Sequence, residues 1–110
     1  MTDQTRAADR LVDSLIMAGT DTVFSLSGNQ IMSIYDAAIG KPLRIVHARH
    51  EGGAVYMADG YSRASGKVGV ALVTAAPGFT NALGPLYPVM QSQTALLLLS
   101  GDSPTNRDSM

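Results

Sequence analysis

The residues with the clearest chemical potential are a carboxylate and two glycines at one junction of the chain. Glu51 follows a short apolar segment and is followed directly by Gly52 and Gly53. A glutamate in the first turn of a helix suits the positive end of the helix dipole, so its presence alone has a structural explanation. Each glycine weakens a helix by about 1 kcal/mol relative to alanine. The pair therefore predicts that a ligand or a neighbouring chain approaches the backbone closely.

Two histidines lie near this carboxylate. His47 and His50 are three residues apart at the end of a predicted strand, and no third ligand follows at a spacing that suits zinc. We therefore interpret them as hydrogen-bonded or surface imidazoles and expect no metal ligands in this chain. The chain has no cysteine, which excludes disulfides and thiolate metal sites.

Helical and strand patterns alternate along the whole chain and position this junction. Uninterrupted apolar segments separated by amphipathic stretches are typical of parallel strands joined by right-handed crossovers. The sequence therefore predicts an α/β fold, a parallel sheet with helices on both faces. We expect strands over residues 22–26, 43–46, 68–74 and 95–99, helices over residues 8–18, 31–38, 51–65 and 77–93, and a final loop over residues 101–110.

Prolines mark the last of these helices. Pro77 suits the first helical position, where a missing N–H is harmless. Pro85 and Pro88 follow inside the same segment, and each removes a helix hydrogen bond and clashes with a carbonyl one turn back. We therefore expect this helix to kink or break, with the break between residues 81 and 93.

The composition is that of one cytoplasmic globular domain over residues 1–110. The chain is 45% hydrophobic and 15% charged, with a formal net charge of −1, which gives no electrostatic footprint for nucleic acid. The polar N-terminus is unlike a secretory signal. The longest strongly apolar run, residues 94–100, is far short of the ~20 residues that cross a bilayer. We expect neither nucleic acid nor a membrane as a partner.

Four blocks of residues together resemble a known enzyme family. They are Gly-Asn-Gln-Ile at 28–31, Arg-His-Glu-Gly-Gly-Ala at 49–54, Met-Ala-Asp-Gly-Tyr-Ser-Arg-Ala-Ser-Gly-Lys at 57–67 and Val-Thr-Ala-Ala-Pro-Gly-Phe-Thr-Asn at 73–81. In this order they resemble the N-terminal pyrimidine-binding domain of thiamine-diphosphate-dependent enzymes, in particular the acetolactate synthase branch. The resemblance covers nearly all of the chain in unbroken register, so it is far more specific than a lone glycine motif.

The resemblance implies a role for four residues. In this family the glutamate that matches Glu51 forms a hydrogen bond with a ring nitrogen of the cofactor's aminopyrimidine, and the imino form that it stabilises removes the proton from the thiazolium carbon. Gly28 matches a turn that lies against the cofactor, and Pro77 and Asn81 match positions near the pyrimidine. The residue types alone leave alternatives open: turn formation for Gly28, helix initiation for Pro77 and a satisfied polar group for Asn81.

The resemblance also implies parts that lie outside this chain. The family's magnesium and diphosphate motif, a Gly-Asp-Gly followed by paired asparagines, does not occur in it. We therefore expect Mg²⁺ and its ligands on a diphosphate-binding domain of a longer polypeptide or of another chain, in a homodimer or tetramer. The implied activity is a transferase or lyase reaction on a 2-keto acid, namely carboligation after decarboxylation. The alternatives are a decarboxylase of the oxalyl-CoA or benzoylformate type, and a non-catalytic module that keeps only the fold and the dimer surface.

Overall fold

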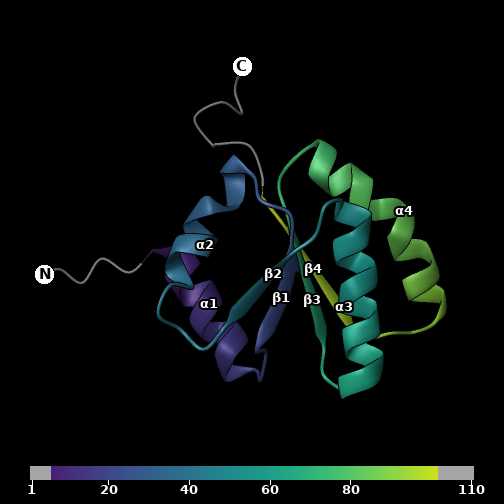
Figure 1. Cartoon of the computed structure of the whole chain (residues 1–110), viewed down its shortest axis with the longest axis horizontal. Coiled ribbons are helices and arrows are strands. Elements are labelled where there is room, and N and C mark those ends of the chain that lie inside the picture. Colours follow the sequence, from purple (N-terminus) through teal and green to yellow (C-terminus); the bar gives the residue numbers. More distant parts are fainter. Residues whose placement is uncertain (1–5, 102–110) are drawn as a thin grey trace, which may run out of the picture.

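The computed structural model of the chain describes residues 6–101. Its elements are α1 (Ala7–Met17), β1 (Thr22–Ser25), η1 (Asn29–Ile31), α2 (Met32–Ala37), β2 (Arg44–His47), α3 (Glu51–Ser65), β3 (Gly69–Val73), α4 (Pro77–Gln91) and β4 (Leu96–Ser100). The strands pair in parallel in the order β2-β1-β3-β4. In Figure 1, α1 and α2 cover one face of the sheet and α3 and α4 cover the other. The predicted fold class is confirmed, whereas the predicted final loop lies outside the described residues after Gly101.

Alternating side chains of the two central strands build two separate cores. Because successive residues of a strand point to opposite faces, neighbours in β1 and β3 enter different cores. Val23, Val70 and Leu72 pack with α1 and α2, and Phe24, Ala71 and Val73 pack with α3 and α4. The sheet is thus buried on both sides at its centre, as a parallel sheet requires.

Small residues let α3 lie close to the sheet. Ala54 and Ala58 are fully buried, and a Cβ placed on Gly69 of β3 would lie 2.1 Å from the carbonyl oxygen of Ala58. The helix ends at Gly66, whose φ of 76° belongs to the left-handed region that glycine favours. The position of α3, and of Glu51 at its start, therefore depends on a close backbone contact with β3.

The break predicted in the last helix is wrong. α4 is continuous from Pro77 to Gln91, with Pro85 and Pro88 inside it, and its ribbon changes direction along its length (Figure 1). A residue before proline usually avoids the helical region because its Cβ meets the proline ring. Gly84 has no Cβ, so this restriction is absent before Pro85, whereas Tyr87 has one and is nevertheless helical before Pro88. The prolines bend the helix without ending it.

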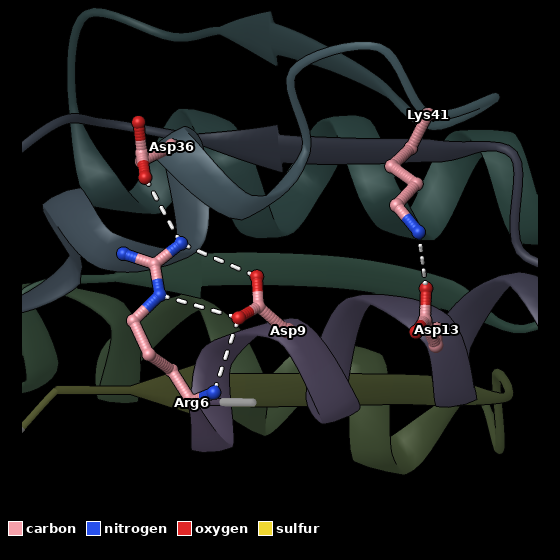
Figure 2. Close-up of polar contacts among 5 residues, drawn as sticks. All are labelled: Arg6, Asp9, Asp13, Asp36 and Lys41. Atoms are coloured by element: carbon pink, nitrogen blue, oxygen red, sulfur yellow. Dashed lines mark hydrogen bonds and ion pairs between the residues drawn. The ribbon is translucent and has the colours of Figure 1, made fainter. Parts of the chain in front are cut away.

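Exposed ion pairs connect α1 with α2 and the segment that follows it (Figure 2). The guanidinium of Arg6 lies 3.2 Å from the carboxylate of Asp9 and 2.9 Å from that of Asp36. The ammonium of Lys41 lies 2.9 Å from the carboxylate of Asp13. Because all five side chains are solvent-accessible, these pairs orient the helices and contribute little to stability.

Candidate functional site

The carboxyl ends of the strands meet at one edge of the sheet, and the predicted site residues follow them. Gly28 comes after β1, Glu51 begins α3 after β2, and Pro77 begins α4 after β3. Ligands of open α/β folds bind at this edge. The topology therefore gathers residues that are far apart in the sequence at the end of the sheet where a site is expected.

Glu51 and Asn81 are in direct contact. The side-chain amide of Asn81 donates a hydrogen bond to Oε1 of Glu51 at 3.2 Å, and Glu51 is only 8% exposed. No ion pair within residues 6–101 involves Glu51. Burying a carboxylate without a cation costs stability. Groups that violate folding rules in this way are expected at functional sites.

The two histidines have structural contacts. His50 is the N-cap of α3, and its Nδ1 accepts a hydrogen bond from the backbone N–H of Gly52 at 2.9 Å, which fixes the first turn and with it Glu51. The ring of His47 lies 5.6 Å from that of Tyr35, centroid to centroid. Residues 6–101 contain no group of three His, Asp or Glu side chains that could hold a metal ion.

The two glycines after Glu51 have different surroundings. A Cβ on Gly52 would lie 2.9 Å from Cγ of Pro85, whereas one on Gly53 would meet only Ala48 at 3.9 Å. The close approach predicted from this pair therefore occurs at Gly52. Within the chain, the group that approaches Gly52 is the ring of Pro85, because α3 and α4 pack directly on each other.

Gly28 lies against Thr74, the residue that follows β3. A Cβ on Gly28 would lie 2.5 Å from Cβ of Thr74. The φ of Gly28 lies outside the left-handed region. Among the described residues, the glycines with φ in that region are Gly19, Gly40 and Gly66. Space, and not backbone conformation, therefore requires glycine at position 28.

Pro77 occupies the first position of α4, as the sequence predicts, and is exposed. The preceding Ala76 has φ 58° and ψ −111°, a conformation that costs an alanine on the order of 1–3 kcal/mol and that often occurs near functional sites. A hollow of about 320 Å³ opens beside it, lined by Ala76, Phe79, Ser100 and Gly101. Pro77 begins the helix that carries Asn81.

Sequence reasoning did not single out Thr74 and Gly78. The Thr74 hydroxyl donates to Oε1 of Gln30 at 2.7 Å. A Cβ on Gly78 would lie 2.8 Å from Cγ2 of Thr74 and 3.5 Å from Oε2 of Glu51. Both residues belong to the block over 73–81, but their spacing does not show that the side chain of one fills the space left by the other.

Comparisons with known proteins show the family to which the chain belongs. Residues 5–110 match the family described as thiamine pyrophosphate enzyme, N-terminal TPP binding domain; thiamine pyrophosphate (TPP) is thiamine diphosphate. The acetolactate synthase large subunit IlvG of Mycobacterium tuberculosis is 40% identical over 105 residues, which are 94% of this chain and 19% of that protein. The acetolactate synthase isozyme 3 large subunit of Escherichia coli is 43% identical over 101 residues, 90% of this chain and 17% of that protein.

A solved structure agrees as well. It is described as that of "a putative thiamin diphosphate-dependent enzyme isolated from Mycobacterium smegmatis", and its TM-score is 0.89 at 28% identity, covering 97% of this chain and 20% of that one. The chain thus spans about a fifth of the length of these relatives. Fold, motifs and relatives together show that the chain belongs to the N-terminal TPP-binding domain family of thiamine pyrophosphate enzymes and is acetolactate synthase-like in sequence.

Proposed function

We propose that this chain is the pyrimidine-binding part of a thiamine-diphosphate-dependent enzyme acting on 2-keto acids, and that Glu51 is its proton-handling carboxylate. One observation carries the proposal. Glu51 is buried at the carboxyl edge of the sheet, with Asn81 bonded to Oε1 and a glycine beside Oε2. One oxygen of the carboxylate is thus held by the protein, and the other adjoins a position without a side chain.

The residues present fit an aminopyrimidine. The missing side chains of Gly28 and Gly78 make room for Thr74, so these two glycines keep the wall beside Glu51 compact and bring backbone close to where a flat ring would lie. A ring nitrogen needs a polar partner, which Oε2 of Glu51 supplies. We therefore assign Glu51 and Asn81 to hold the ring's polar edge and Gly28 and Pro77 to shape the space around it.

Each of these residues has a distinct task in the proposed reaction. When bound, thiamine diphosphate supplies the carbon nucleophile and the electron sink for decarboxylation of a 2-keto acid. Glu51 exchanges a proton between its Oε2 and the ring nitrogen. Asn81 holds Oε1, so the carboxylate keeps one orientation. α3 and α4 bury Glu51 and keep water from competing for that proton.

The remainder of the assembly is part of the proposal. A diphosphate-binding domain, from the same polypeptide or another chain, supplies the oxygen ligands of Mg²⁺. Exposed apolar side chains follow one stripe of α4 and support a homodimer or tetramer. They are Phe79, Leu83, Tyr87 and Met90, which are 41–71% exposed. The proposed reaction class is transferase or lyase, with carboligation after decarboxylation as in acetolactate synthases.

The cytoplasmic location expected from the composition stays a prediction. Within residues 6–101, no helix combines the length and the apolar content needed to cross a bilayer.

Turnover in a reconstituted assembly tests the proposal. The chain is combined with a diphosphate-binding domain, Mg²⁺ and thiamine diphosphate, and the consumption of 2-keto acids such as pyruvate is followed. We expect turnover that needs all of these components and that is lost when Glu51 is replaced by Gln. Turnover that is unaffected by omission of this chain would show it to be the non-catalytic module. The products distinguish carboligation from simple decarboxylation.

The isolated chain should bind the cofactor weakly. Glu51, Asn81, Gly28 and Pro77 reach only the pyrimidine end, whereas most of the affinity for a charged diphosphate comes from Mg²⁺ and its ligands. Calorimetry with thiamine diphosphate and Mg²⁺ should therefore detect no micromolar binding, and light scattering should show association of the chain. Micromolar binding by a stable monomer would contradict the assignment of the diphosphate site to another domain.

A further inference from the structure

The side chain of Thr74 occupies the space between two glycines that belong to different loops. A Cβ on Gly28, in the segment after β1, would lie 2.5 Å from Thr74 Cβ, 2.6 Å from Oγ1 and 2.8 Å from Cγ2. A Cβ on Gly78, in the first turn of α4, would lie 2.8 Å from Cγ2. Real Cβ atoms do not approach this closely, so both glycines leave room for the threonine.

The contact at Gly78 reaches the carboxylate through α4. Gly78 is separated from Asn81 by three positions, so the two residues lie on the same face of the helix, and Asn81 donates the hydrogen bond to Glu51. Thr74 Cγ2 lies against Gly78, so it stands between the end of β3 and the turn of α4 that leads to Asn81.

We propose that Thr74 is a positioning residue whose methyl group, held between Gly28 and Gly78, sets the start of α4 and therefore the bond between Asn81 and Glu51. The hydroxyl of Thr74 has a separate contact, the exposed hydrogen bond to Gln30. The shape of the side chain, and not this hydrogen bond, carries the effect. The inference rests on the proposed function for its importance to catalysis, but it can be tested without cofactor.

The sharpest test introduces a steric clash at Gly78 and then removes it with a second substitution at Thr74. Gly78→Ala places a methyl against Thr74 Cγ2, and Thr74→Ser removes Cγ2 while it keeps the hydroxyl. In nuclear magnetic resonance spectra of the 110-residue chain, Gly78→Ala should shift the side-chain amide signals of Asn81 and speed backbone amide exchange in the first turns of α4 about tenfold. The double variant with Thr74→Ser should return both to within about threefold of wild type.

Gly28→Ala is the matched control. Its methyl would meet Thr74 Cβ itself at 2.5 Å, an atom that serine retains. Thr74→Ser should therefore not relieve Gly28→Ala. Equal relief at both glycines, or no relief at Gly78, would overturn the proposal.

A second pair of variants applies even if the alanine variants fail to fold. Thr74→Val keeps the shape and loses the hydroxyl, whereas Thr74→Ser keeps the hydroxyl and loses the methyl. We expect the Asn81 amide signals to move in the serine variant and to stay in place in the valine variant. A residue that serves stability alone would lower the unfolding midpoint without moving these signals. Movement in the valine variant, or none in the serine variant, would contradict the assignment.

Discussion

Carboxylates at the two ends of the parallel strands have opposite surroundings. At the edge where β1 and β3 begin, Asp21 accepts hydrogen bonds from the Tyr61 hydroxyl, from Lys67 at 2.9 Å and from Thr22 at 3.0 Å. At the edge where these strands end, Glu51 is buried with the amide of Asn81 as its partner. Asp21 is exposed and accepts three hydrogen bonds, one of them from a cation. Glu51 is buried, and its partner is a neutral amide.

The difference separates a carboxylate that stabilises the fold from the one that we propose acts on the cofactor. The hydrogen bond from Tyr61, followed by those from Lys67 and Thr22, holds the pKa of Asp21 well below its ordinary value. The same contact with Asp21 raises the pKa of Tyr61, and Asp21 also raises the pKa of Lys67. The contacts with Asp21 keep both Asp21 and Lys67 charged. The hydrogen bond from Tyr61 connects α3 to the start of the sheet. Changes at this edge should alter stability, and changes at the opposite edge should alter chemistry.

The largest expected effect is at the beginning of β3, where packing alone decides the outcome. Gly69→Ala would place a Cβ 2.1 Å from the carbonyl oxygen of Ala58, and because that atom is backbone, α3 must move away from the sheet. We expect a loss of about 3 kcal/mol in the free energy of unfolding, measured by denaturant titration.

Gly60→Ala on the same helix is the control. A Cβ there meets nothing within 4 Å, and alanine suits a helix better than glycine, so a gain of up to about 1 kcal/mol is expected. Equal losses at Gly60 and Gly69 would show that the close contact with Ala58 is not what positions α3.

The second-largest expected effect concerns the hydrogen bond between Asn81 and Glu51. Asn81→Ala removes the one hydrogen bond to the Glu51 side chain that the structure shows within residues 6–101. A hydrogen bond to a charged group contributes about 1.5–3 kcal/mol, so proton exchange of the cofactor in the assembled enzyme should slow about 10- to 100-fold. Gln91→Ala, which removes an amide of the same helix bonded to Tyr87, should leave the rate unchanged. Similar losses in both variants would assign the effect to α4 as a whole.

The smallest expected effect is a pH dependence of the structural edge. A carboxylate with a lowered pKa stabilises the fold above its ordinary titration range, and this contribution disappears as the pH falls through the lowered value. The unfolding midpoint of Asp21→Asn should therefore be below that of wild type near pH 7, and the difference should shrink below about pH 4. A difference that stays constant from neutral to acid pH would contradict the assignment of this charge to stability.

Local patterns were sufficient to predict the elements but not the contacts between them. Each strand boundary was placed within a residue of the structure, and α3 was placed at Glu51–Ser65, because apolar spacing and capping are local signals. The break expected between residues 81 and 93 did not occur. Before Pro85, the missing Cβ of Gly84 relaxes the restriction that a proline imposes on the preceding residue. Tyr87 has a Cβ and is nevertheless helical before Pro88, so the rule alone overstates the effect of a proline.

The candidate site divides in the same way. Gly28, Glu51, Pro77 and Asn81 were identified from motifs, and the topology places them at one edge. The bond between Asn81 and Glu51, and the space that Thr74 fills, depend on how α4 packs against α3 and β3. No spacing in the sequence encodes that packing.

The central claim is that Glu51 handles the proton that activates the cofactor. Exchange of the thiazolium C2 proton of thiamine diphosphate for deuterium, followed in the assembled enzyme, measures this step before any substrate chemistry. Glu51→Gln keeps the volume and a hydrogen-bonding group but cannot exchange the proton, so the rate should fall about 100-fold or more with the fold unchanged. Asp59→Asn, which alters an acidic residue of the same helix paired with Arg63, should keep the wild-type rate. An exchange rate in Glu51→Gln within a few-fold of wild type would contradict the claim.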